Sequence, residues 1–130
     1  MIVVDASVVI EVLLQTDDGI AIVDRLFTST ETLHAPHLID IEVAQVLRRY
    51  VLRGEVKAAR AQQAIEVMVG FPLTRSDHEP LLGRIWELRE NVTAYDAAYV
   101  ALAEGLNATL VTRDRKLSAV PVLRGAVELV

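Results

Sequence analysis

Hydrophobic residues occur along this chain in two patterns, short unbroken runs and longer stretches with helical spacing. Residues 1–4 form an apolar run without alternation, which is typical of a strand buried on both faces of a parallel sheet, and residues 109–112 (Thr-Leu-Val-Thr) are a second strand of this buried type. From residue 38 to 53, apolar side chains recur at three or four positions and form one arc of a helix, with Gly54 as a natural stop. The pattern therefore predicts buried strands and amphipathic helices in the same chain.

The remaining segments extend this alternation to the whole sequence. We expect helices at residues 6–14, 17–27, 55–69, 77–90 and 93–106, a turn or short helix at 113–118, and further strands at 33–35, 71–73 and 120–123. Pro72 cannot donate to an interior ladder, so its strand is expected at a sheet edge. Strands alternating with helices, without a linker or repeat, predict one α/β domain with a mainly parallel sheet.

Composition limits the class of protein. Of the 130 residues, 52% are hydrophobic and 24% are charged, which is far from a disordered composition. The longest apolar stretch, residues 97–103, is too short to span a membrane, and Asp5 and Glu11 interrupt the apolar N-terminus, so no signal peptide is expected. The absence of cysteine excludes a disulfide scaffold and thiolate metal sites. We expect a single-domain cytoplasmic protein that does not associate with membranes.

The charge balance restricts the partners that the chain can attract. Eighteen acidic residues outnumber thirteen basic ones, giving a formal net charge of −5. A net acidic chain has no general attraction for nucleic acid, so a polyanionic partner requires a local basic patch or bridging cations.

Several familiar ligand motifs are absent from the sequence. It contains no glycine-rich dinucleotide or P-loop motif and no serine-nucleophile elbow. His34 and His37 have a spacing that could hold a metal, but no further His or Cys lies nearby, which favours an ordinary loop pair. His78, in a predicted first helical turn, is expected on the surface.

Two carboxylates follow the strands predicted at residues 1–4 and 109–112. Asp5 ends the first strand, and Asp114 lies two residues beyond Thr112, the end of the second. Ligands gather at the carboxyl ends of parallel strands, so the two side chains would share a crevice if these strands are neighbours. Each could instead simply cap the helix or turn that follows it.

Asp96 lies on a helix that is apolar nearly all round, which marks a buried helix. An ionised carboxylate there costs several kcal/mol unless it is paired or bound to a cation. The alternative is a capping box with Thr93, in which Asp would be a poorer partner than Glu or Gln. Glu42 differs, because on a helical wheel it falls beside Gln45, Arg49 and Arg53, which favours a solvated face.

Carboxylates gathered in one crevice would form an all-oxygen site for a hard divalent cation such as Mg²⁺. Such a site suits phosphodiester hydrolysis, in which the cation polarises the phosphoryl oxygen and activates water. The cation would also let an acidic chain hold RNA. Arg113, Arg115 and Lys116 around Asp114 would supply a positive rim for flanking phosphates.

Four segments together resemble the PIN-domain ribonucleases, most closely the VapC-type toxins of bacterial and archaeal toxin–antitoxin pairs. The segments are Val-Val-Asp5-Ala-Ser7-Val, Ala35-Pro-His-Leu-Ile-Asp-Ile-Glu42-Val, Thr93-Ala-Tyr-Asp96-Ala-Ala-Tyr-Val-Ala-Leu-Ala103 and Leu110-Val-Thr-Arg-Asp114-Arg-Lys-Leu117. They occur in the family's order and at its usual spacing, and the resemblance covers essentially the whole chain.

The resemblance implies a fold and a set of site residues. The fold would be a three-layer α/β/α PIN-like sandwich over residues 1–130, with a short, mainly parallel central sheet. Ser7 and Thr112 match hydroxyl positions that orient carboxylates or bound waters. The family's four acidic metal-binding positions, for Mg²⁺ with Mn²⁺ as a substitute, match Asp5, Glu42, Asp96 and Asp114.

The resemblance also implies an activity and partners. The activity would be Mg²⁺-dependent endoribonuclease cleavage that inhibits translation and growth, by the toxin of a VapBC-type pair. The partners would be RNA, a cognate antitoxin that occludes the acidic pocket, and a second copy in a homodimer. The high apolar content independently favours a homodimer with a groove for an antitoxin helix. The alternative is an inactive PIN-like module that binds RNA or a protein, and metal-dependent RNA cleavage lost with one carboxylate would discriminate.

Overall fold

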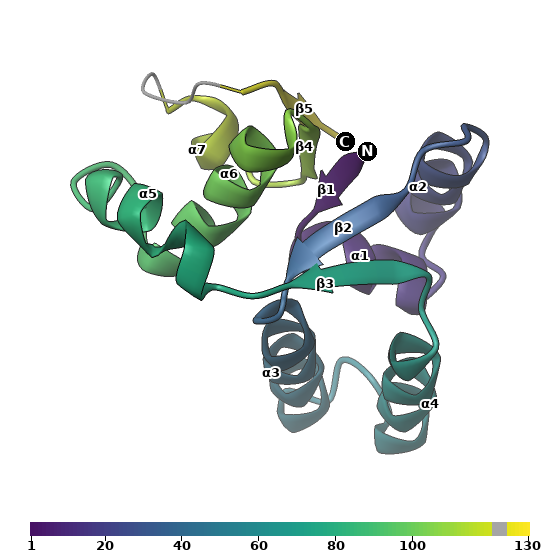
Figure 1. Ribbon diagram of the computed structural model, residues 1–130. Coiled ribbons are helices and arrows are strands. Elements are labelled where there is room, and N and C mark those ends of the chain that lie inside the picture. The colour runs from purple at the N-terminus through teal and green to yellow at the C-terminus, as the bar shows by residue number, and fades with distance from the viewer. Residues whose placement is uncertain (121–124) are drawn as a thin grey trace.

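A parallel sheet forms the centre of the protein (Figure 1), and the computed structural model describes residues 1–120 and 125–130. Its strand order is β3-β2-β1-β4-β5, and every neighbouring pair is parallel. The strands are β1 (Ile2–Val4), β2 (Leu33–Pro36), β3 (Leu73–Ser76), β4 (Thr109–Thr112) and β5 (Val127–Leu129). The predicted parallel α/β architecture is therefore confirmed.

Strands β1 and β4 lie side by side at the middle of the sheet. Val3 pairs in register with Leu110, and all three residues of β1 are fully buried. Such burial is expected of the central strands of a parallel sheet, because helices cover both faces of the sheet. The strands predicted at residues 1–4 and 109–112 are thus neighbours at the centre of the sheet.

Helices cover the sheet on both sides (Figure 1). One layer contains α1 (Ala6–Leu13), α2 (Asp17–Phe27), α3 (Ile39–Leu52) and α4 (Ala58–Val69). The opposite layer contains α5 (Leu82–Glu87), α6 (Ala94–Leu106) and α7 (Arg115–Ser118), with the 3₁₀ turn η1 (Glu79–Leu81) before α5. The three-layer α/β/α arrangement is the one that the sequence resemblance implied.

Helix ends follow local signals in the sequence. Gly54, just beyond α3, has φ +73°, a conformation that glycine adopts without steric cost.

Residues 97–103 of α6 are all buried, as expected for a helix that is apolar nearly all round. In the part of the chain that the structure describes, no helix combines the length and apolar character needed to cross a bilayer.

Two predicted elements differ from those observed. The single helix expected at residues 77–90 is instead the 3₁₀ turn η1 followed directly by the short α5, which ends at Glu87 and is followed by turns at residues 88–91. A strand is also expected at residues 71–73, at an edge of the sheet. The observed strand, β3, does lie at an edge, but it starts at Leu73, the residue after Pro72.

The last predicted strand also needs correction. Val120 lies outside any strand, and residues 121–123 of that prediction fall outside the described residues. The strand beside β4 is β5, which the sequence pattern did not indicate. Its middle residue, Glu128, forms an ion pair with Arg25 of α2 at 2.6 Å, so a charged residue interrupts the apolar run expected of a strand.

Candidate active site

The candidate site lies at the carboxyl edge of the sheet, where the strand order changes direction. From β1 the chain proceeds outward to β2 and β3, and then returns to β4 on the other side of β1. Such a switch point opens a crevice between the ends of the two central strands. Asp5 follows β1 and Asp114 follows β4, so both carboxylates lie at this crevice, as the sequence predicted.

Asp5 is the most buried carboxylate of the site, with 9% of its surface exposed. Its Oδ1 accepts hydrogen bonds from the Ser7 hydroxyl and from the amide of Val8 (3.2 Å), and its Oδ2 accepts from the Thr112 hydroxyl. Burial raises the pKa of Asp5, and these donors counteract the rise. Asp5 therefore caps α1 and also faces the crevice, so the two interpretations of its role are compatible.

Thr112 and Ser7 connect Asp5 to the loop that carries Asp114. Thr112 is fully buried; its hydroxyl donates to Asp5 and accepts from the amide of Asp114 at 3.0 Å. The Ser7 hydroxyl donates to Asp5 and accepts from the amide of Arg113 at 3.1 Å. Both hydroxyls orient a carboxylate, which is the role that the family resemblance implied for them.

Asp96 lies in the first turn of α6, half-buried on the wall of the crevice. Its backbone amide donates to the Thr93 hydroxyl at 3.2 Å, so Thr93 caps the helix, but among the described residues the Asp96 carboxylate makes no return bond to the Thr93 amide, as a capping box would require. Burial is the main reason that the pKa of Asp96 is raised, and the charges of Asp114 and Asp5 add to the effect. The cap therefore does not remove Asp96 from the acidic site.

Glu42 comes from α3, in the opposite helix layer, and it reaches the same crevice. Its Oε1 accepts a hydrogen bond from the phenol of Tyr99 on α6 at 2.6 Å. Burial raises the pKa of Glu42, with a further contribution from the charges of Asp96 and Asp5. The solvated face favoured by its periodicity is therefore wrong, whereas the position implied by the resemblance is the one observed.

Sequence reasoning did not assign a role to Tyr99 or to His78. Burial and the neighbouring Glu42 hold the pKa of the Tyr99 phenol above its ordinary range, so the phenol remains a hydrogen-bond donor. His78 is not a plain surface residue, since its Nε2 accepts from the amide of Leu38 at 3.0 Å, just before α3. A bidentate pair between Arg75 and Asp40 (2.8 Å) also holds the start of α3. These contacts fix the helix turn that carries Glu42.

The predicted basic rim is only partly at the crevice. Arg113 lines it, but its guanidinium pairs with Asp18 at 2.9 Å and lies 3.9 Å from Glu11. Arg115 and Lys116 are exposed on α7 and do not line the crevice. The side chain of Asp114 accepts from the Lys116 amide at 2.8 Å and thereby caps α7.

The crevice is a cavity of about 680 Å³ whose lining includes both apolar side chains and a set of carboxylates. Its walls come from both helix layers and contain all four predicted acidic residues, Asp5, Glu42, Asp96 and Asp114, together with Glu11. Among residues 1–120 and 125–130, no three His, Cys, Asp or Glu side chains are grouped as a ready metal site. Asp5, Glu42 and Asp114 instead accept hydrogen bonds from protein donors. The donor set fits a hard divalent cation, because it consists of carboxylate oxygens.

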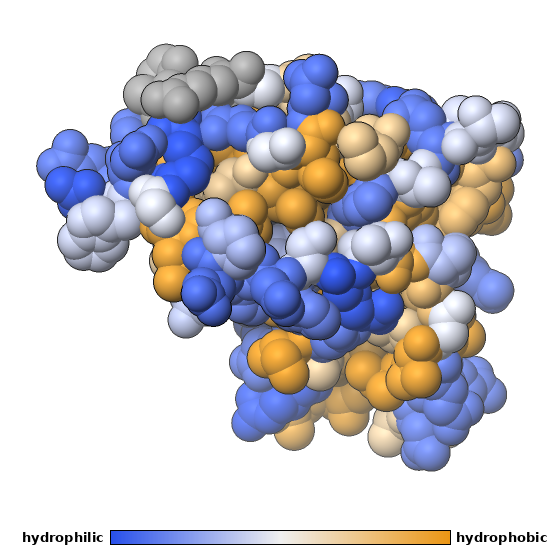
Figure 2. Space-filling model, viewed as in Figure 1, coloured by the Kyte–Doolittle hydropathy of each residue, from blue (hydrophilic) through white to orange (hydrophobic). Residues whose placement is uncertain are grey.

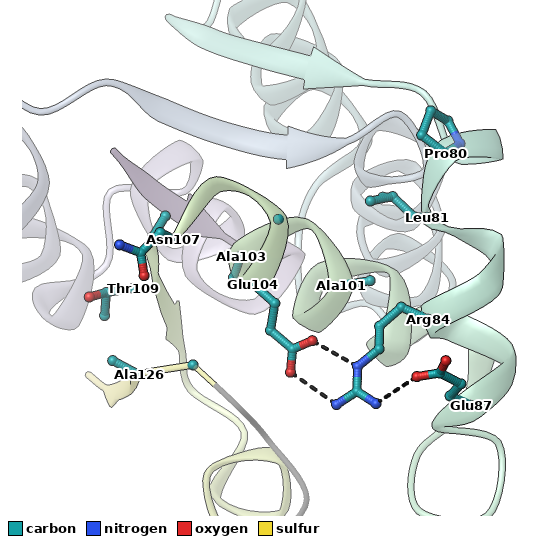
Figure 3. A pocket seen from close by; sticks show the side chains of 13 residues that line it. Pro80, Leu81, Arg84, Glu87, Ala101, Ala103, Glu104, Asn107, Thr109 and Ala126 are labelled. Atoms are coloured by element: carbon teal, nitrogen blue, oxygen red, sulfur yellow. Dashed lines mark hydrogen bonds and ion pairs between the residues drawn. The ribbon is translucent and has the colours of Figure 1, made fainter.

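A second cavity, of about 560 Å³, lies at the amino end of β4, at the opposite edge of the sheet (Figure 3). Arg84 of α5 donates to Glu104 of α6 at 2.8 Å and pairs with Glu87 at 3.1 Å. Because two carboxylates neutralise this guanidinium, we assign the cluster to the joining of α5 and α6.

The raised pKa values of the acidic residues predict how stability depends on pH. Asp and Glu groups with ordinary pKa values of 3.8 and 4.5 titrate at higher pH in the folded protein at Asp5, Asp96 and Glu42. The folded state then binds more protons than the unfolded state over this window, so the contribution of these groups to stability falls as the pH rises through it.

Thermal melts of the metal-free wild type and of Glu42→Gln between pH 4 and 7.5 test this prediction. The variant is expected to gain stability relative to the wild type as the pH rises. Taking the difference cancels groups such as Glu128, whose pKa is lowered by Arg25 and whose effect on stability has the opposite sign. A difference that does not change with pH would contradict the raised pKa of Glu42, which burial causes in the first place.

Comparison with known proteins identifies the family. A sequence model described as the PIN domain matches residues 2–123. Ribonuclease VapC9 from Mycobacterium tuberculosis is 48% identical over 118 residues, which are 91% of this chain and 89% of that protein. The chain belongs to the PIN-domain family, among the VapC ribonucleases. Ribonuclease VapC1 from Mycobacterium tuberculosis is 41% identical to this PIN-domain protein over 129 residues, 98% of this chain and 96% of the relative.

A solved structure has the same fold as this PIN domain. The crystal structure of VapBC2 from Rickettsia felis, bound to a DNA fragment from the promoter, matches with a TM-score of 0.72. The match covers 99% of this chain and 98% of the other, at 17% sequence identity. The similarity supports the three-layer architecture, and the family resemblance stated from the four sequence segments is confirmed.

Proposed function

We propose that this PIN domain is a Mg²⁺-dependent endoribonuclease and the toxin of a VapBC-type toxin–antitoxin pair, which hydrolyses RNA and thereby inhibits translation and growth. The observation that supports it most is the presence of Asp5, Glu42, Asp96 and Asp114 on the walls of one cavity. The names of the relatives, which are ribonucleases, point in the same direction. An inactive PIN-like module that binds RNA or protein is the second candidate.

The four carboxylates would hold one or more Mg²⁺ ions, or Mn²⁺ as a substitute. When bound, such a cation polarises a phosphoryl oxygen and activates water for attack on phosphorus. Ser7 and Thr112 keep the Asp5 carboxylate in one orientation, since each donates to a different oxygen of it. Thr112 also ties the Asp114 loop to the same carboxylate.

The decisive experiment is RNA cleavage by the purified protein with Mg²⁺ or Mn²⁺, with EDTA, and with single carboxylate variants. We expect cleavage with either cation, none with EDTA, and none from Asp5→Asn or Glu42→Gln. Asp24→Asn, on the exposed surface of α2, is the matched charge control and should cut normally. RNA binding without any metal-dependent cleavage would favour the inactive module.

Arg49 is a stronger candidate for RNA contact than Arg113. It lines the cavity from α3, two turns beyond Glu42, and no ion pair involving Arg49 occurs within the described part of the chain. Arg113 in contrast is engaged by Asp18 and Glu11. The guanidinium of Arg49, beside the carboxylates of the cavity, would bind a phosphate of the RNA backbone, and Arg115 and Lys116 would contact phosphates farther out.

Arg49→Gln is therefore expected to raise KM for RNA by roughly tenfold, the value of one charge-assisted hydrogen bond, with kcat nearly unchanged. Arg53→Gln, which removes the same charge from the exposed end of α3, is the control. Steady-state kinetics at several salt concentrations measure both parameters. Equal KM values for the two variants would exclude Arg49 from the RNA contact.

The proposed protein partners are a second copy of the chain and a cognate antitoxin. Figure 2 shows hydrophobic side chains gathered on the surface over α3 and α4. An apolar groove lies there, and its exposed large residues include Leu52 and Ile65. Exposed apolar surface of this kind favours protein contacts. Light scattering of the protein, alone and with the product of a neighbouring gene, tests both partners; a stable monomer in both samples would exclude them.

A further inference from the structure

We propose that Tyr99 is a positioning residue that sets the affinity of the acidic site for its divalent cation by holding the Glu42 carboxylate in place. This inference rests on the proposed function, because the proposed function is what assigns a metal site to the four carboxylates. Its basis is the 2.6 Å hydrogen bond from the Tyr99 phenol to Glu42 Oε1.

The contact joins the two helix layers across the end of the sheet. Glu42 lies on α3 in one layer, whereas Tyr99 and Asp96 lie on α6 in the other. Tyr99 follows Asp96 by three residues, so the same face of α6 presents both side chains to the cavity. The phenol therefore fixes the distance between the carboxylate from α3 and the carboxylate from α6.

Tyr99 itself cannot easily move. Only 2% of its surface is exposed, and it is among the largest fully buried side chains of the protein. Its neighbours along α6, from Ala97 to Ala103, are all buried as well. The hydroxyl is thus delivered from a rigid, packed ring, which is the property expected of a group that orients a ligand.

Glu42, by contrast, needs an external constraint. Its side chain has three rotatable bonds and is only half-buried, and the carboxylates of Asp96 and Asp5 repel it. Among the described residues, Tyr99 is the sole hydrogen-bond donor to this carboxylate. Without that donor, the charge would turn outward to solvent, and a cation would have to restore its position at a cost in binding free energy.

Removing a partner that orients a metal ligand typically weakens metal binding 10- to 100-fold. For Tyr99→Phe, which retains the ring, we expect Mg²⁺ or Mn²⁺ affinity to fall by about tenfold or more in calorimetric titrations of the whole chain. The Mg²⁺ concentration for half-maximal RNA cleavage should rise by the same factor, while kcat at saturating Mg²⁺ stays near the wild-type value.

Tyr50→Phe is the matched control. Tyr50 lines the same cavity from α3 and is half-buried, and no hydrogen bond of its hydroxyl is present within the described residues. The Tyr50→Phe variant, which also loses a phenol hydroxyl, should therefore bind the cation as tightly as the wild type. A second test is the double variant Tyr99→Phe with Glu42→Gln, which should bind the cation no more weakly than Glu42→Gln alone, because Tyr99 acts through Glu42.

Two results with the Tyr99→Phe variant would overturn the proposal. Tyr99→Phe could melt at a lower temperature and bind the cation like the wild type, which would make the phenol purely structural. It could also weaken binding equally in the Glu42→Gln background, which would show that Tyr99 acts elsewhere. A wild-type protein that neither binds a divalent cation nor cleaves RNA would instead overturn the proposed function, and that result is visible before any Tyr99 variant is made.

Discussion

Replacing Asp96 with Asn is expected to abolish RNA cleavage and to leave the metal-free protein as stable as the wild type or more stable. Asp96 is half-buried at the start of α6, where burial and the charges of Asp114 and Asp5 raise its pKa. Asn keeps the shape of the side chain and removes its charge. The metal-free variant therefore loses repulsion and retains its packing.

Activity should fall by about two orders of magnitude or more, because the variant lacks a negative charge where a divalent cation has to be held. The measurements are RNA cleavage at saturating Mg²⁺ and thermal melts in EDTA at acidic and neutral pH. Stabilisation should be larger at neutral pH, since the raised pKa of Asp96 leaves part of the wild-type carboxyl already uncharged in acid.

A role for Asp96 as a helix cap alone predicts the opposite result. The Thr93 hydroxyl accepts from the backbone amide of residue 96, a bond that the Asn substitution leaves intact. If the carboxylate served only the helix end, the variant would lose about 1 kcal/mol of stability and cut RNA at the normal rate. If the Asp96→Asn variant is less stable and cleaves RNA normally, the role of Asp96 is structural.

Replacing Thr112 with Val is expected to cause a large loss of both stability and activity. Thr112 is fully buried, and its hydroxyl donates to Asp5 and accepts from the Asp114 amide. Val has nearly the same shape but leaves both of these groups without their partner. Since an unsatisfied buried group costs roughly 1–3 kcal/mol, and a charged one more, we expect a loss of about 2–5 kcal/mol in unfolding free energy.

Cleavage by Thr112→Val should also fall by at least about tenfold, because Asp5 and Asp114 lose the hydroxyl that orients both of them. Denaturant unfolding and RNA cleavage assays measure the two effects. Thr112→Ser, which restores the hydroxyl, should recover most of the activity. If the Ser variant is as defective as the Val variant, the methyl group and its packing are the cause, and the positioning role is wrong.

Much of the site could be predicted from local sequence. The unbroken apolar run of β1 and the largely buried β4 are typical of strands at the centre of a parallel sheet. Once these strands are central, Asp5 and Asp114 at their ends must share one edge. The apolar surroundings of Asp96 likewise predicted a partly buried carboxylate, because hydrophobic periodicity indicates which face of a helix is buried.

Hydrophobic periodicity did not predict the surroundings of Glu42 or its contact with Tyr99. A helical wheel gives the face of α3 on which Glu42 lies, but not which other element approaches that face. The approach of α6 across the end of the sheet turns an apparently solvated carboxylate into a half-buried one bonded to a phenol. The four-segment resemblance supplied Glu42, and only the packing of the two helix layers revealed Tyr99.

The edges of the structure depended most on tertiary contacts. Strand β5 has only three residues, with Glu128 in the middle, and it is stabilised by pairing with β4 and by the ion pair to Arg25. Arg113 carries the charge that the sequence assigned to RNA, yet Asp18 of α2 neutralises it. The sequence by itself determined which segments are buried strands and helices and which carboxylates follow them, because burial preference is a property of each segment. The tertiary structure alone decided which charges are paired and which hydroxyl orients which carboxylate, because these depend on contacts between segments far apart in the chain.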